Sequence, residues 1–395
     1  MKSILKYGLS LLILVSFCRP SSAIVVADYG VATNTPSGAW DLNWDYVYNY
    51  KNSSAVAVGS HWLLTAAHVG DDGGAGTVVV NGVNYYQQEV IFHAAADDPQ
   101  HSNKADLALV RFDKPFPGYY PLYTGTFPTD QPGPSDNRLN AVMVGYGVTG
   151  TVYSTYYTAV PYTDPSKGTK RWGSQKVDGT DTANYDVGGT TGITYNDGIQ
   201  MLFDSSDTTY ESGVGTYDSG GGTFVDDGGT WKLAGINTVR YGGPTDFTGT
   251  FGVSVPAYET WMTQMMDSVT GDLDADGIPN WWEEQYGSTT GVVASADQDG
   301  DDATGSDEYI ADTDPTDSNA VWQASGDFSV TNQTFTFDGS TARKYQLLYT
   351  TNDLADPGLT WISNGVPIWG AGAGTEIIVT NTEDTVFYRV WVTLP

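Results

Sequence analysis

Residues 64–68 read Leu-Thr-Ala-Ala-His, which places His68 directly behind two small alanines. Later in the chain, Asp106 precedes the apolar run Leu107–Val110, and Ser219 is followed by three glycines. A serine hydroxyl becomes nucleophilic at neutral pH when an imidazole takes its proton and a carboxylate orients that imidazole. The three segments therefore predict a catalytic triad. Ser219 would be the nucleophile, His68 the general base and acid, and Asp106 the group that orients the histidine.

Each of these residues also has a purely structural interpretation. A histidine can be held in a core by hydrogen bonds, an aspartate at a strand edge can face solvent, and a glycine-rich turn can contain an ordinary serine. Burying Asp106 beside Leu107–Val110 would be costly without a partner, and donation from His68 Nδ1 would supply one. The occurrence of all three residues in this order favours the catalytic interpretation.

The order His68, Asp106, Ser219 and its flanking residues resemble the trypsin/chymotrypsin-like serine proteases. The separations of 38 and 113 residues also suit that family. The resemblance implies an all-β fold of two six-stranded antiparallel barrels at residues 24–269, closed by a short C-terminal helix. It further implies a secreted serine endopeptidase that cleaves proteins or peptides through an acyl-enzyme and needs no cofactor for catalysis. The alternative is a non-catalytic binding or adhesion protein on the same scaffold.

One position departs from the family pattern. The family has glycine two residues before the nucleophile, where a backbone N–H helps to form the oxyanion hole, whereas this chain has Tyr217. The resemblance implies that the N–H groups of Tyr217 and Ser219 are the donors. A side chain at this position opposes the backbone conformation that the hole requires. Either the hole forms with some strain, or it assembles on substrate binding, or activity is weak.

Residues 1–23 are typical of a secretory signal peptide, with a basic start, a short apolar run and small residues before the expected cleavage point. Cleavage there would make Ile24 the new N-terminus. In the family, such a terminus pairs its ammonium with the aspartate just before the catalytic serine, which is Asp218 here. The resemblance therefore implies that signal removal is the activating step. The alternative is that Ile24 only begins a strand.

The resemblance also locates a specificity pocket, by counting back from Ser219 without gaps. It places the base of the pocket at Gly213 and its walls at Thr238, Val239, Arg240 and Gly252. Trypsin-type members have an aspartate at the base. Because no carboxylate is expected there, lysine or arginine before the scissile bond is not expected, and a neutral, small or apolar residue is favoured. Arg240 offers the alternative of an acidic residue.

The chain has 395 residues, a formal net charge of −30 and one cysteine, Cys18, which lies within the predicted signal peptide. The mature protein would therefore lack disulfides although it is exported, either out of the cell or to the periplasm. So acidic a surface repels nucleic acid and anionic membranes, which excludes nucleic acid as a partner. No transmembrane segment is expected after signal removal.

Short alternating runs separated by Gly, Pro, Asn and Asp predict strands throughout residues 24–269, and Val255–Met266 predicts a closing amphipathic helix. Strand patterns return in residues 319–395, where they predict a small C-terminal β-sandwich. Aromatic residues of this module such as Trp361 and Trp391 either fill its core or bind a surface or carbohydrate ligand.

Between the two β-rich parts lies an acidic linker, residues 270–318. From Asp267 to Asp317 there are fifteen Asp or Glu residues and no Lys or Arg. Unpaired, so many carboxylates would repel one another and keep the segment disordered. Their alternate spacing indicates hard-cation sites instead, because oxygen ligands at alternate positions wrap such an ion.

Residues 272–283 match the D-x-D-x-D-G-x₅-E calcium-loop pattern in full, and residues 297–308 match it except that Asp302 replaces the turn glycine. The predicted ligands are Asp272, Asp274, Asp276, the Ile278 carbonyl and Glu283 in the first loop, and Asp297, Asp299, Asp301, the Ala303 carbonyl and Glu308 in the second. Both loops resemble thrombospondin type 3 and dockerin-like repeats. The resemblance implies structural Ca²⁺ that spaces the protease from the C-terminal module; the alternative is a solvated acidic linker.

Overall fold

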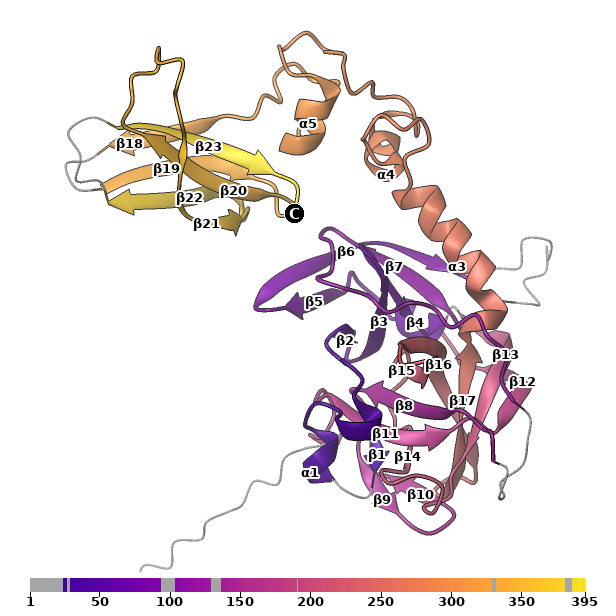
Figure 1. Ribbon diagram of the computed structural model, residues 1–395. Helices are drawn as coiled ribbons and strands as arrows, with labels where there is room; N and C mark the ends of the chain where they lie inside the picture. The colour runs from indigo at the N-terminus through magenta and orange to yellow at the C-terminus, as the bar shows by residue number, and fades with distance from the viewer. Residues whose placement is uncertain are drawn as a thin grey trace, which may run out of the picture.

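The computed structural model describes residues 24–26, 29–93, 104–128, 136–189, 191–328, 332–380 and 386–395 (Figure 1). The predicted signal peptide, residues 1–23, lies outside the described residues. The fold is mostly β, with two barrel-like sheets, a helix, an acidic connection and two small sheets in chain order. Among the described residues, no helix combines the length and apolar character that a membrane crossing requires.

The first sheet has six strands in the order β2-β3-β4-β7-β6-β5. They are β2 Val47–Tyr50, β3 Ser53–Gly59, β4 Trp62–Thr65, β5 Thr77–Val80, β6 Val83–Phe92 and β7 Ala108–Phe112. Neighbouring strands pair antiparallel, and the outer strands β2 and β5 contact each other, so the sheet curls into a barrel. The two-residue period is clear in β5, which buries Val78 and Val80 and exposes Thr77 and Val79.

The second sheet contains a six-strand series in the order β11-β8-β15-β16-β17-β13. These strands are β8 Asn140–Gly145, β11 Arg171–Lys176, β13 Ile193–Leu202, β15 Gly222–Asp226, β16 Trp231–Gly242 and β17 Phe247–Ser254. The end strands β11 and β13 contact each other. The expected pair of antiparallel barrels is therefore present, and a continuous hydrophobic core extends from the first into the second.

Three further strands extend the second sheet. The hairpin of β9 Gly150–Val152 and β10 Tyr157–Ala159 lies between β8 and β11 in sequence and reaches β17, where Tyr157 pairs with Phe247. Strand β12 Gly179–Asp186 pairs with β13 along its whole length. Tyr157 of β10 lies against Gly213, and Tyr185 of β12 lies close to Asp106.

The N-terminal strand β1 Val25–Val26 is buried and pairs with β14 Ser212–Gly213. Helix α1 Tyr29–Ala32 and the 3₁₀ helix η1 Gly38–Trp40 follow it. The first described residues of the chain therefore pack against the second barrel, although the strands of the first barrel follow them in sequence.

Helix α3 Val255–Thr270 starts directly after β17 and has a proline in its first turn, where a missing N–H is tolerated. It buries Val255 and Met262 and packs Trp261 against the core. The predicted closing helix is confirmed, and it continues for four residues beyond Met266. Helix α2 Ala67–Gly70 is a single turn that follows β4.

The acidic linker is folded. It contains helix α4 Asn280–Glu283, the 3₁₀ helix η2 Glu284–Tyr286 and helix α5 Gly305–Ala311. Its small core consists of Ile278, Trp282 and Val292. Thr304 caps α5 through a reciprocal capping box with Asp307.

The C-terminal module consists of two three-stranded sheets, β18-β19-β22 and β21-β20-β23. Their bounds are β18 Ala324–Phe328, β19 Asn332–Gly339, β20 Lys344–Thr350, β21 Ile362–Trp369, β22 Gly372–Thr380 and β23 Phe387–Thr393. Side chains of the two sheets meet between them, as in the ring pair Phe337–Tyr345 with centroids 4.7 Å apart. This arrangement agrees with the expected β-sandwich.

The C-terminal module touches the first barrel at one edge. The ring of Trp369 lies edge-on to Tyr85, with centroids 6.4 Å apart, and the ammonium of Lys114 lies 5.5 Å from the Trp369 ring. Thr341 also donates to Asp113 at 3.2 Å. Lys114 is itself buried and paired with Asp113 at 2.6 Å.

Candidate active site and cation-binding loops

His68 and Asp106 form a close pair. His68 lies in α2, and Asp106 lies two residues before β7. The His68 ring donates from Nδ1 to Asp106 Oδ2 at 2.8 Å, and the backbone N–H of His68 donates to Asp106 Oδ1 at 3.0 Å. Asp106 is fully buried, whereas His68 keeps part of its ring exposed. The carboxylate therefore fixes both the position and the tautomer of the imidazole.

Two residues from the second barrel complete the surroundings of Asp106. Asn196 of β13 accepts from the Asp106 backbone N–H at 2.7 Å. Tyr185 of β12 directs its hydroxyl toward Asp106 Oδ2 at 3.4 Å and toward Thr238 Oγ1 at 3.0 Å. Sequence reasoning missed Tyr185 and Asn196, because they are 79 and 90 residues from Asp106 in the chain and only the folded structure brings them to it.

The protonation of His68 reflects opposing effects. Burial of the ring lowers its pKa, but the hydrogen bond and charge of Asp106, with smaller contributions from Asp71 and Asp72, outweigh it. The net pKa of His68 lies above its ordinary value of 6.5. By contrast, burial lowers the pKa of His61 to about 4, and burial also lowers the pKa of His93.

Ser219 lies on a turn of the second barrel that the first barrel holds in place. The backbone N–H of Ser54 donates to the Ser219 carbonyl at 3.0 Å. Gly220, with φ of 82°, lies so close to β3 that a Cβ there would meet the Ser54 carbonyl at 2.0 Å. Ser219 Oγ makes one long contact, 3.4 Å, to the carbonyl of Thr238. Among the described residues no hydrogen bond joins Ser219 to His68, a common state of unliganded sites that tighten on binding.

Tyr217 adopts the left-handed conformation that a glycine would favour, with φ of 74°. Such a conformation costs a non-glycine residue about 1–3 kcal/mol. Its carbonyl is held by the hydroxyls of Ser53 and Ser54, at 3.2 and 3.4 Å. The ammonium of Lys167 lies 5.0 Å from the centroid of the Tyr217 ring. The surrounding contacts therefore hold the backbone in this conformation despite its strain.

The two candidate oxyanion donors are oriented by their neighbouring carbonyls. The Thr216 carbonyl accepts from Val148 N–H at 2.8 Å, and the Asp218 carbonyl accepts from Gly221 N–H at 2.9 Å. Because C=O and N–H point in opposite directions across a trans peptide, the N–H groups of Tyr217 and Ser219 point away from those partners. Within the described part of the chain, no group accepts a hydrogen bond from either N–H.

Asp218 is fully buried between the Ser219 turn and β1. Its carboxylate accepts from Gly147 N–H and Gly215 N–H, each at 2.7 Å, and also from the backbone N–H of Ile24. Burial raises the pKa of Asp218 to about 6, although these hydrogen bonds and the charge of Arg171 lower it. The structure thus places the backbone N–H of Ile24 in contact with the Asp218 carboxylate.

The five residues of the predicted pocket lie at different depths. Thr238 lies beside Ser219, and the next residues of β16, Val239 and Arg240, are partly exposed. Gly213 and Gly252 are buried within strands, Gly252 between β13 and β16. Arg240 lines a hollow of about 540 Å³ together with Thr216 and Tyr217 of the Ser219 turn.

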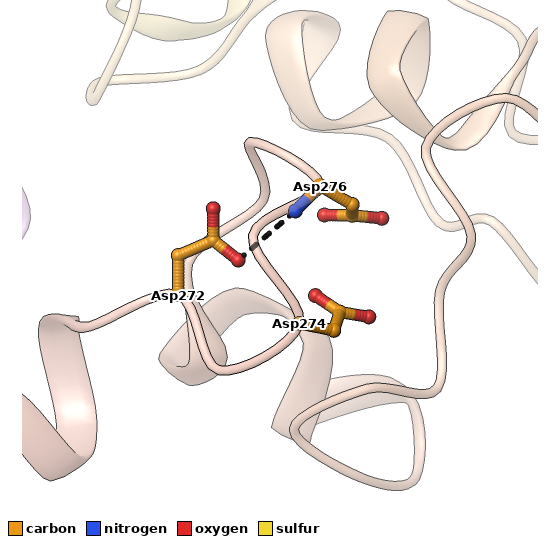
Figure 2. A group of neighbouring side chains, drawn as sticks. All are labelled: Asp272, Asp274 and Asp276. Carbon is orange, nitrogen blue, oxygen red and sulfur yellow. Dashed lines mark hydrogen bonds between the residues drawn. The ribbon is translucent and has the colours of Figure 1, made fainter.

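The first acidic loop gathers its three aspartates. Carboxylate oxygens of Asp272, Asp274 and Asp276 lie within 4.8 Å of one another (Figure 2). Asp272 accepts from the backbone N–H groups of Asp276 and Gly277, at 3.2 and 2.9 Å. Gly277, with φ of 96°, makes the tight turn. The loop therefore has the local fold that its sequence pattern requires.

The second acidic loop repeats this fold. Oxygens of Asp297, Asp299 and Asp301 also lie within 4.8 Å of one another. Asp297 accepts from the N–H groups of Asp301 and Asp302, at 3.2 and 3.1 Å. Asp302 has φ of 75°, so it takes the left-handed conformation of the missing turn glycine. The substitution is accommodated, at the expense of some backbone strain.

The glutamate that ends each loop is buried with oxygen atoms that lack a partner. Glu283 and Glu308 are 0% and 1% exposed. Glu283 Oε2 and both carboxylate oxygens of Glu308 make no hydrogen bond among the described residues. Burial raises the pKa of Glu308 to about 7, and the charges of Asp299 and Asp301 add to this effect. Buried, unsatisfied carboxylates beside three aspartates fit the oxygen-rich donor set of Ca²⁺.

The trypsin family matches residues 31–262, which is more than half of the chain, and the chain therefore belongs to this family. At that general level it is a serine peptidase with protein substrates. No curated protein matches the chain.

Solved structures similar to the chain include neuropsin, a serine protease expressed in the limbic system of mouse brain. It has 18% identity over 57% of this chain and 96% of its own, with a TM-score of 0.38. The active form of the Rv3671c protease from M. tuberculosis has 13% identity over 53% of this chain and 72% of its own, with a TM-score of 0.35. Its inactive form has 14% identity over 62% and 98%, with a TM-score of 0.38.

The opposite pKa shifts of the histidines give a direct test of the His68 environment. In NMR titrations of histidine-labelled protein, we expect the His68 imidazole to titrate above 6.5 and those of His61 and His93 below it. Single histidine-to-glutamine variants assign the signals. Asp72→Asn should lower the pKa of His68, because it removes one of the charges that favour the imidazolium.

The exposed Asp327 provides the control, since Asp327→Asn removes the same charge from the C-terminal module. It should leave the His68 titration unchanged. Added salt should weaken the Asp72 effect, because exposed charges are screened. A His68 signal that titrates below 6.5, like those of His61 and His93, would contradict the pairing with Asp106.

Proposed function

We propose that this chain is a secreted serine endopeptidase whose triad is Ser219, His68 and Asp106. The observation that carries the proposal is the buried Asp106 carboxylate on His68 Nδ1, across the barrel seam from a serine on a glycine-rich turn. The other ring nitrogen of His68 then remains free to take a proton. The raised pKa of His68 makes it a stronger base than an ordinary imidazole.

The reaction follows from these positions. Ser219 Oγ leaves its long contact with the Thr238 carbonyl by rotation of its side chain and attacks the scissile carbonyl carbon. His68 Nε2 takes the hydroxyl proton and passes it to the leaving amine, which gives an acyl-enzyme and the free amine product. Water then attacks the ester while His68 takes its proton, and return of that proton to Ser219 Oγ releases the carboxylic acid product.

Negative charge develops on the former carbonyl oxygen in both steps. We assign its stabilisation to the N–H groups of Tyr217 and Ser219. Loss of one such donor costs about 10²–10³ in rate in other enzymes, so the left-handed conformation of Tyr217 is important for activity. Strain at a functional turn of this kind persists because its surroundings, here Ser53 and Ser54, over-determine it.

Labelling with a fluorophosphonate probe tests the proposed nucleophile. We expect the wild-type mature protein to label and to hydrolyse unstructured protein substrates. Ser219→Ala should lose labelling and reduce hydrolysis by a factor on the order of 10⁴ or more. Ser205→Ala serves as a matched control, because Ser205 lies on a different loop of the same barrel and should label normally.

The rival is a non-catalytic binding protein on the same scaffold. It predicts no labelling of the wild-type protein, although the barrels remain folded and cooperative in thermal unfolding. A folded wild-type protein that does not label would refute the proposed activity. Labelling that persists in Ser219→Ala would refute the assignment of the nucleophile alone.

We further propose that export and activation are one event. Removal of residues 1–23 would convert the Ile24 amide into an ammonium beside the buried Asp218. In a chain that retains a peptide bond at Ile24, the carboxylate has hydrogen-bond donors but a pKa raised to about 6. A new positive charge there would favour the ionised carboxylate and fix the Ser219 turn.

This proposal gives a pH dependence with a defined sign. A form that keeps Ala23 before Ile24 binds more protons at Asp218 when folded than when unfolded, between pH 3.8 and about 6. Its free energy of unfolding should therefore fall as pH rises through this window, and the fall should disappear in Asp218→Asn. The mature form should lack most of this fall, as measured by thermal unfolding from pH 4 to 7.

N-terminal sequencing of the exported protein should begin at Ile24. A different terminus would contradict the activation proposal but leave the proposed triad untouched. Equal activity of the mature form and of the form that keeps Ala23 would also contradict the activation proposal and leave the proposed triad untouched.

We also propose that the two acidic loops bind structural Ca²⁺. The residues available are the three aspartates and the buried glutamate of each loop, with Glu283 closing the first loop and Glu308 the second. A bound divalent cation would offset the repulsion among these carboxylates and the burial of the unsatisfied glutamate oxygens. It would thereby hold the connection between α3 and the C-terminal module in one conformation.

Calorimetric titration of the mature protein should show two equivalents of Ca²⁺, with Kd values of about 10⁻⁴–10⁻³ M, the range typical of extracellular modules. Ca²⁺ at about ten times Kd should stabilise the linker by about 1.4 kcal/mol per site. Glu283→Gln and Glu308→Gln should each abolish or strongly weaken one equivalent. The exposed Glu376→Gln should change neither, and an absence of uptake at millimolar Ca²⁺ would refute the sites.

A further inference from the structure

The space expected at the base of the specificity pocket is filled by the protein itself. Tyr157, from the additional β9–β10 hairpin, is fully buried against the backbone of Gly213. A Cβ on Gly213 would meet the Tyr157 ring at 2.1 Å. The tyrosine hydroxyl donates to the carbonyls of Val214 and Gly249, at 3.1 and 3.4 Å. The ring is therefore held in place from both sides.

Tyr157 packs within a buried aromatic cluster. Its ring contacts those of Phe203 and Phe247, with centroids 5.2 and 5.6 Å away, and it shares a buried cluster with Val25. A substrate side chain long enough to reach Gly213 would have to displace this cluster. Long basic and large aromatic side chains are thus disfavoured on steric grounds.

What remains is the hollow of about 540 Å³ above this cluster, which lies between the Ser219 turn and the end of β16. Thr216, Tyr217, Arg240 and Phe247 are among the residues that line it. Ser219 is not among the residues that line the hollow, but Thr216 and Tyr217 of the same turn are. The hollow is the space into which the residue before the scissile bond would place its side chain.

Arg240 is the only charged residue that lines this hollow, among the described residues. Its guanidinium stacks on the Phe247 ring at 3.9 Å, which fixes its plane. It forms no ion pair with any described carboxylate, in a chain with 47 acidic and 17 basic residues. The negative charge of Asp218 acts on the Arg240 guanidinium, but the carboxylate oxygens of Asp218 already accept hydrogen bonds from backbone N–H groups.

We propose that Arg240 makes this protein selective for substrates with a carboxylate side chain, glutamate or aspartate, immediately before the scissile bond. The inference rests on the proposed peptidase activity of Ser219 and adds the substrate class. A guanidinium presents paired donors that match a carboxylate, and partial burial strengthens the interaction. Arg240 also repels lysine and arginine side chains, so the same residue excludes the substrates that trypsin-type members accept.

The test uses fluorogenic peptides that differ only in the residue before the cleaved bond: Glu, Asp, Gln, Ala, Leu or Lys. Measurements near 0.15 M salt limit the influence of the acidic surface to within about 8 Å. We expect kcat/KM for Glu to exceed that for Gln by about tenfold or more, the range of one charge-assisted hydrogen-bonded contact. Arg240→Gln should remove this preference, and Arg240→Lys should retain part of it.

Lys167→Gln is the matched control, because Lys167 carries a positive charge near the Tyr217 ring but does not line the hollow. It should leave the ratio of Glu to Gln unchanged within about twofold. A wild-type preference for Ala, Leu or Lys would overturn the proposal, as would an unchanged ratio in Arg240→Gln.

A binding experiment separates this inference from the proposed catalysis. Fluorescence anisotropy with Ser219→Ala should show tighter binding of the Glu peptide than of the Gln peptide, and Arg240→Gln in the same background should equalise the two. Equal binding in Ser219→Ala would refute the role of Arg240 even if the wild-type protein labels with fluorophosphonate. If the wild-type protein does not label but Ser219→Ala still binds the Glu peptide more tightly than the Gln peptide, only the proposed activity is refuted.

Discussion

The burial of the Asp106 carboxylate is the constraint on which the rest of the candidate site depends. An ionised carboxylate without partners in a protein interior would be strongly unfavourable. Here the backbone and ring of His68, from the first barrel, both donate to it, and Tyr185 adds a contact from the second. Asn196 fixes the backbone of the same residue from β13. The seam between the barrels is thus closed by the same hydrogen bonds that set the orientation of the imidazole.

The Ser219 turn is also held by contacts from the other barrel, but here the groups that are held belong to the backbone. Ser54 contributes its N–H to the Ser219 carbonyl and its hydroxyl to the Tyr217 carbonyl, and the close approach of Gly220 to β3 leaves no space for a side chain. Because these contacts come from the first barrel, the left-handed backbone at Tyr217 is imposed by tertiary structure. A local preference of tyrosine would not select it.

Much of this architecture could be predicted from local sequence. The flanks of His68 and Ser219 carry the resemblance to the trypsin family, and two-residue periodicity correctly indicated strands such as β5. The closing helix was predictable as well, because its apolar residues recur at helical spacing. These features are encoded within a few neighbouring residues, so they remain visible without the fold.

The features that sequence reasoning missed depend on residues far apart in the chain. Tyr157 lies on a hairpin with no distinctive pattern, and only its pairing with Phe247 brings it over Gly213. Tyr185 and Asn196 are 79 and 90 residues from Asp106 in the chain, and they reach it only because the two barrels pack together. Counting back from Ser219 found Gly213 but could not show that a ring covers it.

Charge distribution connects the specificity site with the linker. The chain is strongly acidic, yet its carboxylates are concentrated where they surround one another, in the loops that end at Glu283 and Glu308. A cation in each loop would neutralise charge where it is most crowded and let both buried glutamates remain ionised. Arg240 is the converse case, because this cation lines a hollow at the Ser219 turn that has no acidic residue among its described lining. In both places uncompensated charge is the basis of a proposal: divalent cations in the linker, and a substrate carboxylate near the Ser219 turn.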